Sequence, residues 1–216
     1  MNLEKFIKLV SPYSMTSVER ISELYNSLEY IRKERISGDI VECGVWKGGN
    51  ILGIIEYLNF HEIFDKKVWL YDTFRGMTEP EEVDIDLNNR KASDILPQVF
   101  CYSSLSEVKN NLSSSMFPKE NIKFVVGDVC ETLDELSNTP ENICILRLDT
   151  DWYKSTKKEL DVLYPKLVDR GILIVDDYGH WAGSKKAVDE YFESSGIKYK
   201  IEKIDYTGIK ILKKYD

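Results

Sequence analysis

Short apolar runs, separated by segments of helical character, constrain the fold of this chain more than any other feature. The runs are DIVECGVW (39–46), VWLYD (68–72), KFVVGD (123–128), ICILRLD (143–149) and ILIVDD (172–177). Strands that are buried on both faces of a sheet read as nearly continuous apolar runs, and the helices between them connect parallel neighbours. The alternation therefore predicts an α/β fold with a mostly parallel sheet and helices on both faces.

Helices and a terminal hairpin complete this prediction. Residues 17–36 are predicted to be helical, with Ser17 or Thr16 as the cap, because apolar side chains recur there at spacings of three and four. Further helices are predicted over residues 48–58, 104–113, 131–137, 155–168 and 184–194. Two strands, 198–205 and 208–214, are predicted to form an antiparallel hairpin at the sheet edge, joined by a turn at 206–207.

The composition limits the partners and the compartment. The chain has 216 residues, for which one domain is expected, and its net charge of −8 disfavours nucleic acid because an acidic surface repels phosphate. No stretch approaches the roughly 18 apolar residues of a membrane span, and the first residues lack a secretion-signal pattern. The four cysteines form no C-x-x-C pair, so we expect reduced thiols in a cytoplasmic protein. Two histidines far apart in sequence exclude a histidine-rich zinc site.

Residues 75–102 interrupt the alternation of strands and helices. Five acidic residues lie between positions 79 and 86, and two asparagines follow them. A long insertion after the second strand is either a solvated loop or a lid over a ligand site. The sequence favours neither interpretation.

The stretch VECGVWKGGN (41–50) joins the first strand to a helix and suits a ligand-binding turn. Glycines let the backbone approach a ligand closely, and a helix N-terminus favours anionic groups. The pattern is not the G-x-G-x-x-G of dinucleotide-binding folds, because Trp46 replaces the middle glycine. Glu42, two residues before Gly44, instead resembles the acidic residue in the first motif of S-adenosylmethionine-dependent methyltransferases, which faces the ammonium group of the cofactor. A tight turn without a ligand is the alternative.

Carboxylates also follow the second and third strands. Asp72 is suited to accept both hydroxyls of a ribose, as acidic residues of nucleotide-binding folds do, or to cap the following turn. Asp128 is expected beside an adenine pocket, although aspartate is also common in turns. The preceding glycine-rich turn favours the ligand-binding interpretation of both.

Four aspartates end the fourth and fifth strands: Asp149, Asp151, Asp176 and Asp177. If these strands are neighbours, the four carboxylates approach one another, and two like charges 4 Å apart repel by roughly 4 kcal/mol at an effective dielectric constant near 20. Such a cluster needs a cation, a shared proton or a partner, and magnesium commonly uses a few carboxylates together with water and substrate. Helix caps and turns are the alternative, but four aspartates are more than capping requires.

Several motifs together resemble the macrocin-type O-methyltransferases. They are LRLDTDWYKST (146–156), LYPKL (163–167), IVDDY (174–178) and KKAVDEY (185–191). VECGVWKGGN and YDTFRGM also match, and SPYSMTSVER (11–20) resembles the segment that precedes the Rossmann-like core. The resemblance covers most of the chain from about residue 11 onward.

The resemblance implies a Rossmann-like class I methyltransferase with a seven-stranded sheet. The expected division is a methyltransferase domain over residues 38–216 and a helical segment over the cofactor site in residues 1–37, with residues 75–102 as a candidate lid insertion. S-adenosylmethionine is the implied methyl donor, and Mg²⁺ binds the acceptor. The acceptor is a hydroxyl of a sugar or of a glycosylated small molecule, and the enzyme is a homo-oligomer.

The resemblance also assigns site residues by position. The implied cofactor-binding residues are Met15, Thr16, Glu42, Gly44, Trp46, Gly48, Asp72, Thr73, Asp128, Val129 and Asp149. The implied metal ligands are Asp151, Asp176, Asp177 and Asp149, or a subset of them. Asp149 is the predicted general base, and His180 is a second catalytic candidate that either acts as a base or lines the acceptor pocket. A loop histidine without a chemical role is the alternative for His180.

Two other classes of function are weighed against this one. A dinucleotide-dependent oxidoreductase is disfavoured by the missing G-x-G-x-x-G and by a carboxylate cluster that hydride transfer does not need. A non-catalytic binding protein on the same fold is disfavoured because it has little reason to retain a repulsive cluster.

Overall fold

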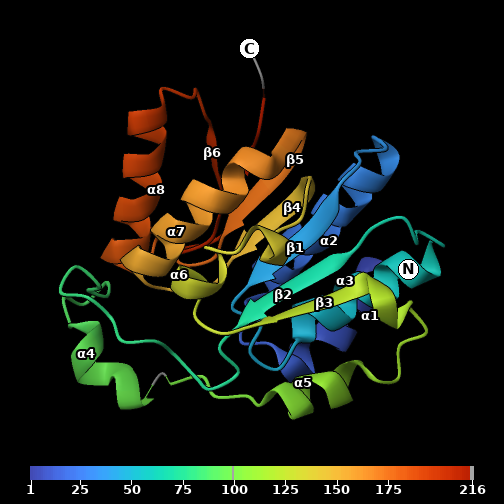
Figure 1. Ribbon diagram of the computed structural model, residues 1–216, viewed down its shortest axis with the longest axis horizontal. Coiled ribbons are helices and arrows are strands. Elements are labelled where there is room, and N and C mark those ends of the chain that lie inside the picture. The colour runs from blue at the N-terminus through green and yellow to red at the C-terminus, as the bar shows by residue number, and fades with distance from the viewer. Residues whose placement is uncertain (99, 215–216) are drawn as a thin grey trace.

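A seven-stranded sheet forms the centre of the protein (Figure 1). The computed structural model describes residues 1–98 and 100–214. The strands are β1 (Asp39–Cys43), β2 (Val68–Asp72), β3 (Ile122–Val126), β4 (Ile143–Leu148), β5 (Leu167–Val175), β6 (Ile201–Lys203) and β7 (Ile209–Leu212). Their order is β3-β2-β1-β4-β5-β7-β6, with β1 to β5 parallel and β7 antiparallel to both β5 and β6. The predicted fold class, including the hairpin at the sheet edge, is confirmed.

Helices cover both faces of the sheet, as Figure 1 shows. They are α1 (Leu3–Val10), α2 (Val18–Lys33), α3 (Gly49–Phe60), α4 (Ala92–Ile95), α5 (Leu105–Leu112), α6 (Val129–Thr132), α7 (Tyr153–Leu163) and α8 (Ala182–Ser195). The sheet separates two apolar cores. Successive side chains of a strand point to opposite faces, so alternate residues of each strand belong to different cores. Ile40 and Ile145 pack with α1, α2 and α3, whereas Val41 and Leu146 pack with α7 and α8. Among the described residues, no helix has both the length and the hydrophobicity needed to cross a bilayer.

Several element boundaries differ from the sequence prediction. Helix α1 was not predicted, and the strand predicted over 198–205 is only three residues long. A helix predicted over 131–137 is instead the short α6, because Asp128 caps it early by accepting the Cys130 N–H at 2.8 Å. Position 99 of the predicted segment 75–102 and the end of the predicted domain, residues 215–216, lie outside the described residues.

The segment 75–102 folds against the N-terminal ends of α7 and α8. Asp84 is fully buried, and its carboxylate accepts the backbone N–H of Tyr153 at 2.8 Å. The Ala182 N–H donates to the carbonyl of Ile85 at 2.9 Å, and the Trp152 indole donates to the carbonyl of Thr78 at 2.9 Å. The acidic run is therefore not uniformly solvated.

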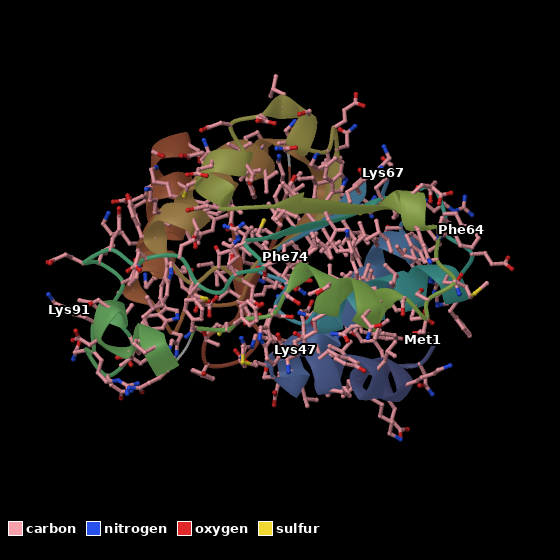
Figure 2. The ribbon with its side chains drawn as sticks, turned by 60° about the horizontal axis from the view of Figure 1, so that its bottom comes forward. Met1, Lys47, Phe64, Lys67, Phe74 and Lys91 are labelled. Atoms are coloured by element: carbon pink, nitrogen blue, oxygen red, sulfur yellow. The ribbon has the colours of Figure 1, made fainter. Side chains whose placement is uncertain are left out.

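A small apolar cluster fills the space under this segment. It contains Ala92 and Ile95 from α4 together with Trp152 and Trp181. In Figure 2, Lys91 marks the outer part of the segment, and Phe74 lies near its base in the middle of the molecule. The segment thus extends from the second strand across the carboxyl ends of the sheet to the two C-terminal helices.

Candidate active site

A cavity of about 300 Å³ opens at the carboxyl ends of β1, β2, β4 and β5. In parallel α/β sheets this edge is where ligands bind. Most of the residues predicted for the site line this cavity: Met15, Thr16, Glu42, Gly44, Trp46, Asp72, Asp149, Asp151, Asp176, Asp177 and His180. A smaller adjoining cavity shares Gly44, Asp72 and Asp149 with it and is also lined by Thr73, Asp128 and Val129.

The glycine-rich turn after β1 is shaped by the neighbouring strand end. Gly44 has a φ of +79°, and a Cβ atom there would lie 2.0 Å from the carbonyl oxygen of Asp149. Trp46 adopts a positive φ of 45°. Gly48 does not line the cavity; it is the N-cap of α3, with a φ of +80°. The turn therefore brings the backbone of β1 directly against that of β4.

Asp72, the last residue of β2, binds this turn through hydrogen bonds to its backbone. Its Oδ2 accepts the backbone N–H groups of Val45 at 2.8 Å and Trp46 at 3.1 Å, and its Oδ1 accepts the N–H of Phe74 at 2.7 Å. Burial raises the pKa of Asp72 against the effect of these donors. A carboxylate offers about four acceptor positions, so the turn-capping interpretation and ribose binding are compatible.

Glu42 has one oxygen engaged and one without a partner. The residue is buried, and its Oε1 accepts from Asn50 Nδ2 at 2.9 Å and from Arg147 Nη1 at 2.6 Å. Its Oε2 is buried without a hydrogen-bond partner. Burial raises the pKa of Glu42 to about 7, although Arg147 acts in the opposite direction. An orphaned acidic oxygen beside a cavity suits a cationic ligand group.

Arg147 is the main site residue that sequence reasoning missed. It is the last residue but one of β4, has 1% of its surface exposed and contacts four polar side chains. Nη1 donates to Asp149 Oδ2 at 2.7 Å as well as to Glu42, and Nη2 donates to Thr16 Oγ1 at 3.0 Å and to Asp176. The signal was present, because a basic residue inside the apolar run ICILRL needs a buried acidic partner.

Three of the four predicted aspartates converge. Ligand oxygens of Asp149, Asp151 and Asp177 all lie within 4.8 Å of one another. Burial, followed by the charge of Asp149, raises the pKa of Asp151 to about 7, and burial and Asp151 raise that of Asp177 well above its usual value. Asp177 Oδ2 is buried and unpartnered. The spacing and the all-oxygen donor set suit a hard divalent cation.

Asp176 is engaged elsewhere. One of its oxygens accepts from Arg147 and the other from Arg20, which lies in the first turn of α2. Arg20 also binds Asp205 in the β6–β7 turn at 2.9 Å. The structure thus places Asp176 in an ion-pair network rather than with the other three aspartates.

His180 lies at the edge of the cavity. Its ring is half-buried between the rings of Trp181 and Tyr206, with centroids 5.0 Å and 6.3 Å away. Burial lowers the pKa of His180, which favours the neutral imidazole. This position suits a pocket residue, and a catalytic role for His180 stays a prediction.

Comparisons with known proteins agree with this geometry. The model of the macrocin-O-methyltransferase (TylF) family matches residues 10–213. Demethyldecarbamoylnovobiocin O-methyltransferase of Streptomyces niveus is 30% identical over 197 residues, which cover 91% of this chain and 74% of that enzyme. The 8-demethyl-8-(2,3-dimethoxy-alpha-L-rhamnosyl)-tetracenomycin-C 4'-O-methyltransferase of Streptomyces olivaceus is 29% identical, with 91% and 74% covered.

A solved structure is similar over nearly the whole chain. The O-methyltransferase NovP superposes with a TM-score of 0.86 at 25% identity and covers 99% of this chain and 98% of its own. The matching family model and the similar enzymes agree on one activity. The chain therefore belongs to the macrocin-O-methyltransferase family and is an O-methyltransferase.

Proposed function

We propose that this enzyme transfers a methyl group from S-adenosylmethionine to a sugar hydroxyl of a small molecule, with Mg²⁺ at the acceptor. The observation that carries the proposal is the convergence of Asp149, Asp151 and Asp177 in the same cavity as the unpartnered oxygen of Glu42. One cavity thus contains a site for a divalent cation and a site for an ammonium group.

The donor is assigned to the glycine-rich turn and the residues around it. Glu42 Oε2 is the partner for the ammonium group, because no other hydrogen bond satisfies this buried oxygen. Asp72 has acceptor capacity left for a ribose hydroxyl. The smaller cavity beside Asp128 and Val129 is assigned to the adenine. Gly44 lines both cavities, and its missing Cβ lets the turn approach the backbone of Asp149 closely.

The metal is assigned to Asp149, Asp151 and Asp177. When bound, Mg²⁺ supplies Lewis-acid polarisation of an acceptor oxygen. Asp176 is not included in this ligand set, because both of its oxygens already accept from guanidinium groups.

Asp149 is the proposed general base. Arg147 donates to its Oδ2, which fixes the carboxylate, and Oδ1 accepts the proton of the acceptor hydroxyl. Trp181 and His180 form an aromatic wall for the non-reacting face of the acceptor. The segment 75–102 excludes water by covering the carboxyl ends of the strands.

The acceptor class rests on the relatives. The enzyme of Streptomyces olivaceus is named for a rhamnosyl-bearing compound. The exposed aromatic ring of Tyr206 beside His180 suits the apolar face of a sugar. A homo-oligomer and a cytoplasmic location stay predictions; all four cysteines are free thiols in the described structure, as expected for a reducing compartment.

Calorimetry and a turnover screen test the proposal together. We expect S-adenosylhomocysteine to bind to the wild type in the presence of either Mg²⁺ or EDTA. The Asp151→Asn variant should bind S-adenosylhomocysteine equally well, and its affinity for Mn²⁺, used as the probe of the metal site, should fall at least tenfold. The matched control is Asp161→Asn, a half-exposed carboxylate on α7 that pairs with Lys157. Glycosides and nucleotide sugars are then screened for methyl transfer with and without EDTA. Unchanged Mn²⁺ affinity in Asp151→Asn would refute the metal site, and absence of S-adenosylhomocysteine binding would refute the donor.

A further inference from the structure

We propose that Arg147 is a positioning residue that holds the donor-binding and metal-binding carboxylates in one geometry. The inference rests on the proposed function and deepens it. Nη1 of Arg147 lies 2.6 Å from Glu42 Oε1 and 2.7 Å from Asp149 Oδ2. A single nitrogen therefore joins the carboxylate assigned to the donor with one of those assigned to the metal.

The strand register explains why these groups meet. Glu42 of β1 pairs directly with Arg147 of β4, so their side chains share one face of the sheet. Asp149 follows Arg147 by two residues and continues on the same face. The three side chains are thus brought together by the sheet itself rather than by a mobile loop.

The shape of the guanidinium matters as well as its charge. Its planar fork directs N–H groups at several acceptors in fixed directions, whereas a lysine ammonium is a single point charge. Here the fork serves Glu42 and Asp149 on one nitrogen, and Thr16 and Asp176 on the other. Lysine at this position would keep the charge and lose the simultaneous contacts.

A second arginine of the same network provides a matched control. Arg20 binds Asp176 and Asp205, and it donates to Ser17 Oγ at 3.2 Å. None of these contacts involves Glu42 or the three converging aspartates. Arg20→Lys therefore disturbs the same ion-pair network without touching the groups that Arg147 is proposed to position.

The experiment compares Arg147→Lys with Arg20→Lys. S-adenosylhomocysteine affinity is measured by calorimetry in EDTA, and Mn²⁺ affinity by electron paramagnetic resonance without the nucleoside. We expect Arg147→Lys to weaken both affinities at least tenfold, and Arg20→Lys to change each by less than threefold. Thermal unfolding measures how much stability each variant loses relative to the wild type. We expect Arg147→Lys and Arg20→Lys to lose similar amounts.

Equal losses of ligand affinity in the two variants would overturn the proposal, because the role of Arg147 would then be structural only. Loss of one affinity alone in Arg147→Lys would also overturn it. If Arg147→Lys does not fold, Thr16→Val removes one contact of Nη2 while the guanidinium remains. We expect at least a threefold loss of Mn²⁺ affinity, and an unchanged value refutes the positioning role. Wild-type protein that binds neither ligand instead refutes the proposed function on which the inference rests.

Discussion

Replacing Gly44 with alanine tests the contact between β1 and β4 that shapes the site. Two costs are expected. Gly44 has a φ of +79°, in the left-handed region that costs an L-residue about 1–2 kcal/mol. The new methyl group would also meet the carbonyl oxygen of Asp149 at 2.0 Å, and this atom belongs to the backbone and cannot rotate away.

The second cost can be separated from the first by a matched glycine. Gly196, the C-cap of α8, has a φ of +67°, and a Cβ atom there would meet nothing within 4 Å. Gly196→Ala therefore carries the backbone cost alone, about 1–2 kcal/mol. Overpacking adds about 1–3 kcal/mol, so Gly44→Ala is expected to lose about 2–5 kcal/mol of the free energy of unfolding.

Thermal unfolding and ligand binding are the assays. For a chain of this size each kcal/mol corresponds to about 2–4 °C in Tm, so the two variants are expected to differ by about 2–12 °C. Gly44→Ala should also weaken S-adenosylhomocysteine binding, since the displaced atom belongs to Asp149, whereas Gly196→Ala should not. Equal Tm values and equal affinities in the two variants would show that the close approach of β1 to β4 is not tight in solution.

Three further outcomes are expected. Because the pKa of Asp151 is raised to about 7 in the folded protein, the folded state binds more protons than the unfolded state between about pH 4 and pH 7. The difference in Tm between the metal-free wild type and Asp151→Asn should therefore decrease as pH rises through that range. A Tm difference that does not change with pH would contradict the raised pKa of Asp151. Mg²⁺ should raise the wild-type Tm most at the upper end of this range, where protons no longer compete, as a thermal-shift titration will show. Asp84→Ala should release the segment 75–102, because Asp84 holds it to the backbone N–H of Tyr153. We expect faster proteolysis within the segment and a higher KM for the acceptor, with little change in S-adenosylhomocysteine affinity. Equal rates of proteolysis in the variant and the wild type would contradict this role of Asp84.

The sheet was predictable because burial on both faces leaves a direct trace in the sequence. Runs such as ICILRL carry apolar residues at nearly every position, and β4 is indeed buried along its whole length. Helix α1 also left a trace, which the prediction did not use: Phe6, Ile7 and Val10 recur at helical spacing after the N-cap Asn2. Of its eight residues Phe6 and Val10 are buried, and they pack against Gly53 of α3, with the Phe6 ring also against Tyr25 of α2. Element ends set by a local cap, such as Asp128 before α6, could not be read from periodicity.

The convergence of the aspartates was predictable in part. Strands β4 and β5 are neighbours, so their carboxyl ends meet as expected. Both Asp176 and Asp177 line the cavity just after β5, but of the two it is Asp177 that joins Asp149 and Asp151, whereas Asp176 accepts from Arg147 and Arg20. Side chains two residues apart along a strand lie on the same side, which places Arg147 beside Asp149. Applying this alternation to the sequence would have identified Arg147 as a site residue. Which of the two neighbouring aspartates joins the cluster of Asp149 and Asp151 depends on Arg20, which is more than 150 residues away in the chain and cannot be paired from sequence alone.

The acidic run of 75–102 shows why composition alone could not choose between a loop and a lid. Glu79, Glu81 and Glu82 are exposed, as an acidic run predicts, whereas Asp84 is fully buried at the N-terminus of α7. A carboxylate is stable there because the first N–H groups of a helix need acceptors and carry partial positive charge. Burial of one acid in such a run depends on a helix that begins about 70 residues later, which no local pattern encodes.

The charge balance of the cavity connects the two proposed ligands. Glu42, Asp72, Asp149, Asp151, Asp176 and Asp177 line the cavity, and among the described residues the guanidinium groups that bind them are those of Arg20 and Arg147. The arginines bind both oxygens of Asp176 and one oxygen each of Glu42 and Asp149. In the described part of the chain, Glu42 Oε2, Asp151 and Asp177 have no guanidinium partner. Burial raises the pKa values of Glu42, Asp151 and Asp177, because ionised carboxylates without sufficient counter-charge are costly away from water. The two regions are separated by Arg147, so one cation cannot relieve both. A cationic donor beside Glu42 and a divalent cation among the aspartates together supply the missing charge, and this is why we expect each ligand to bind its own carboxylates.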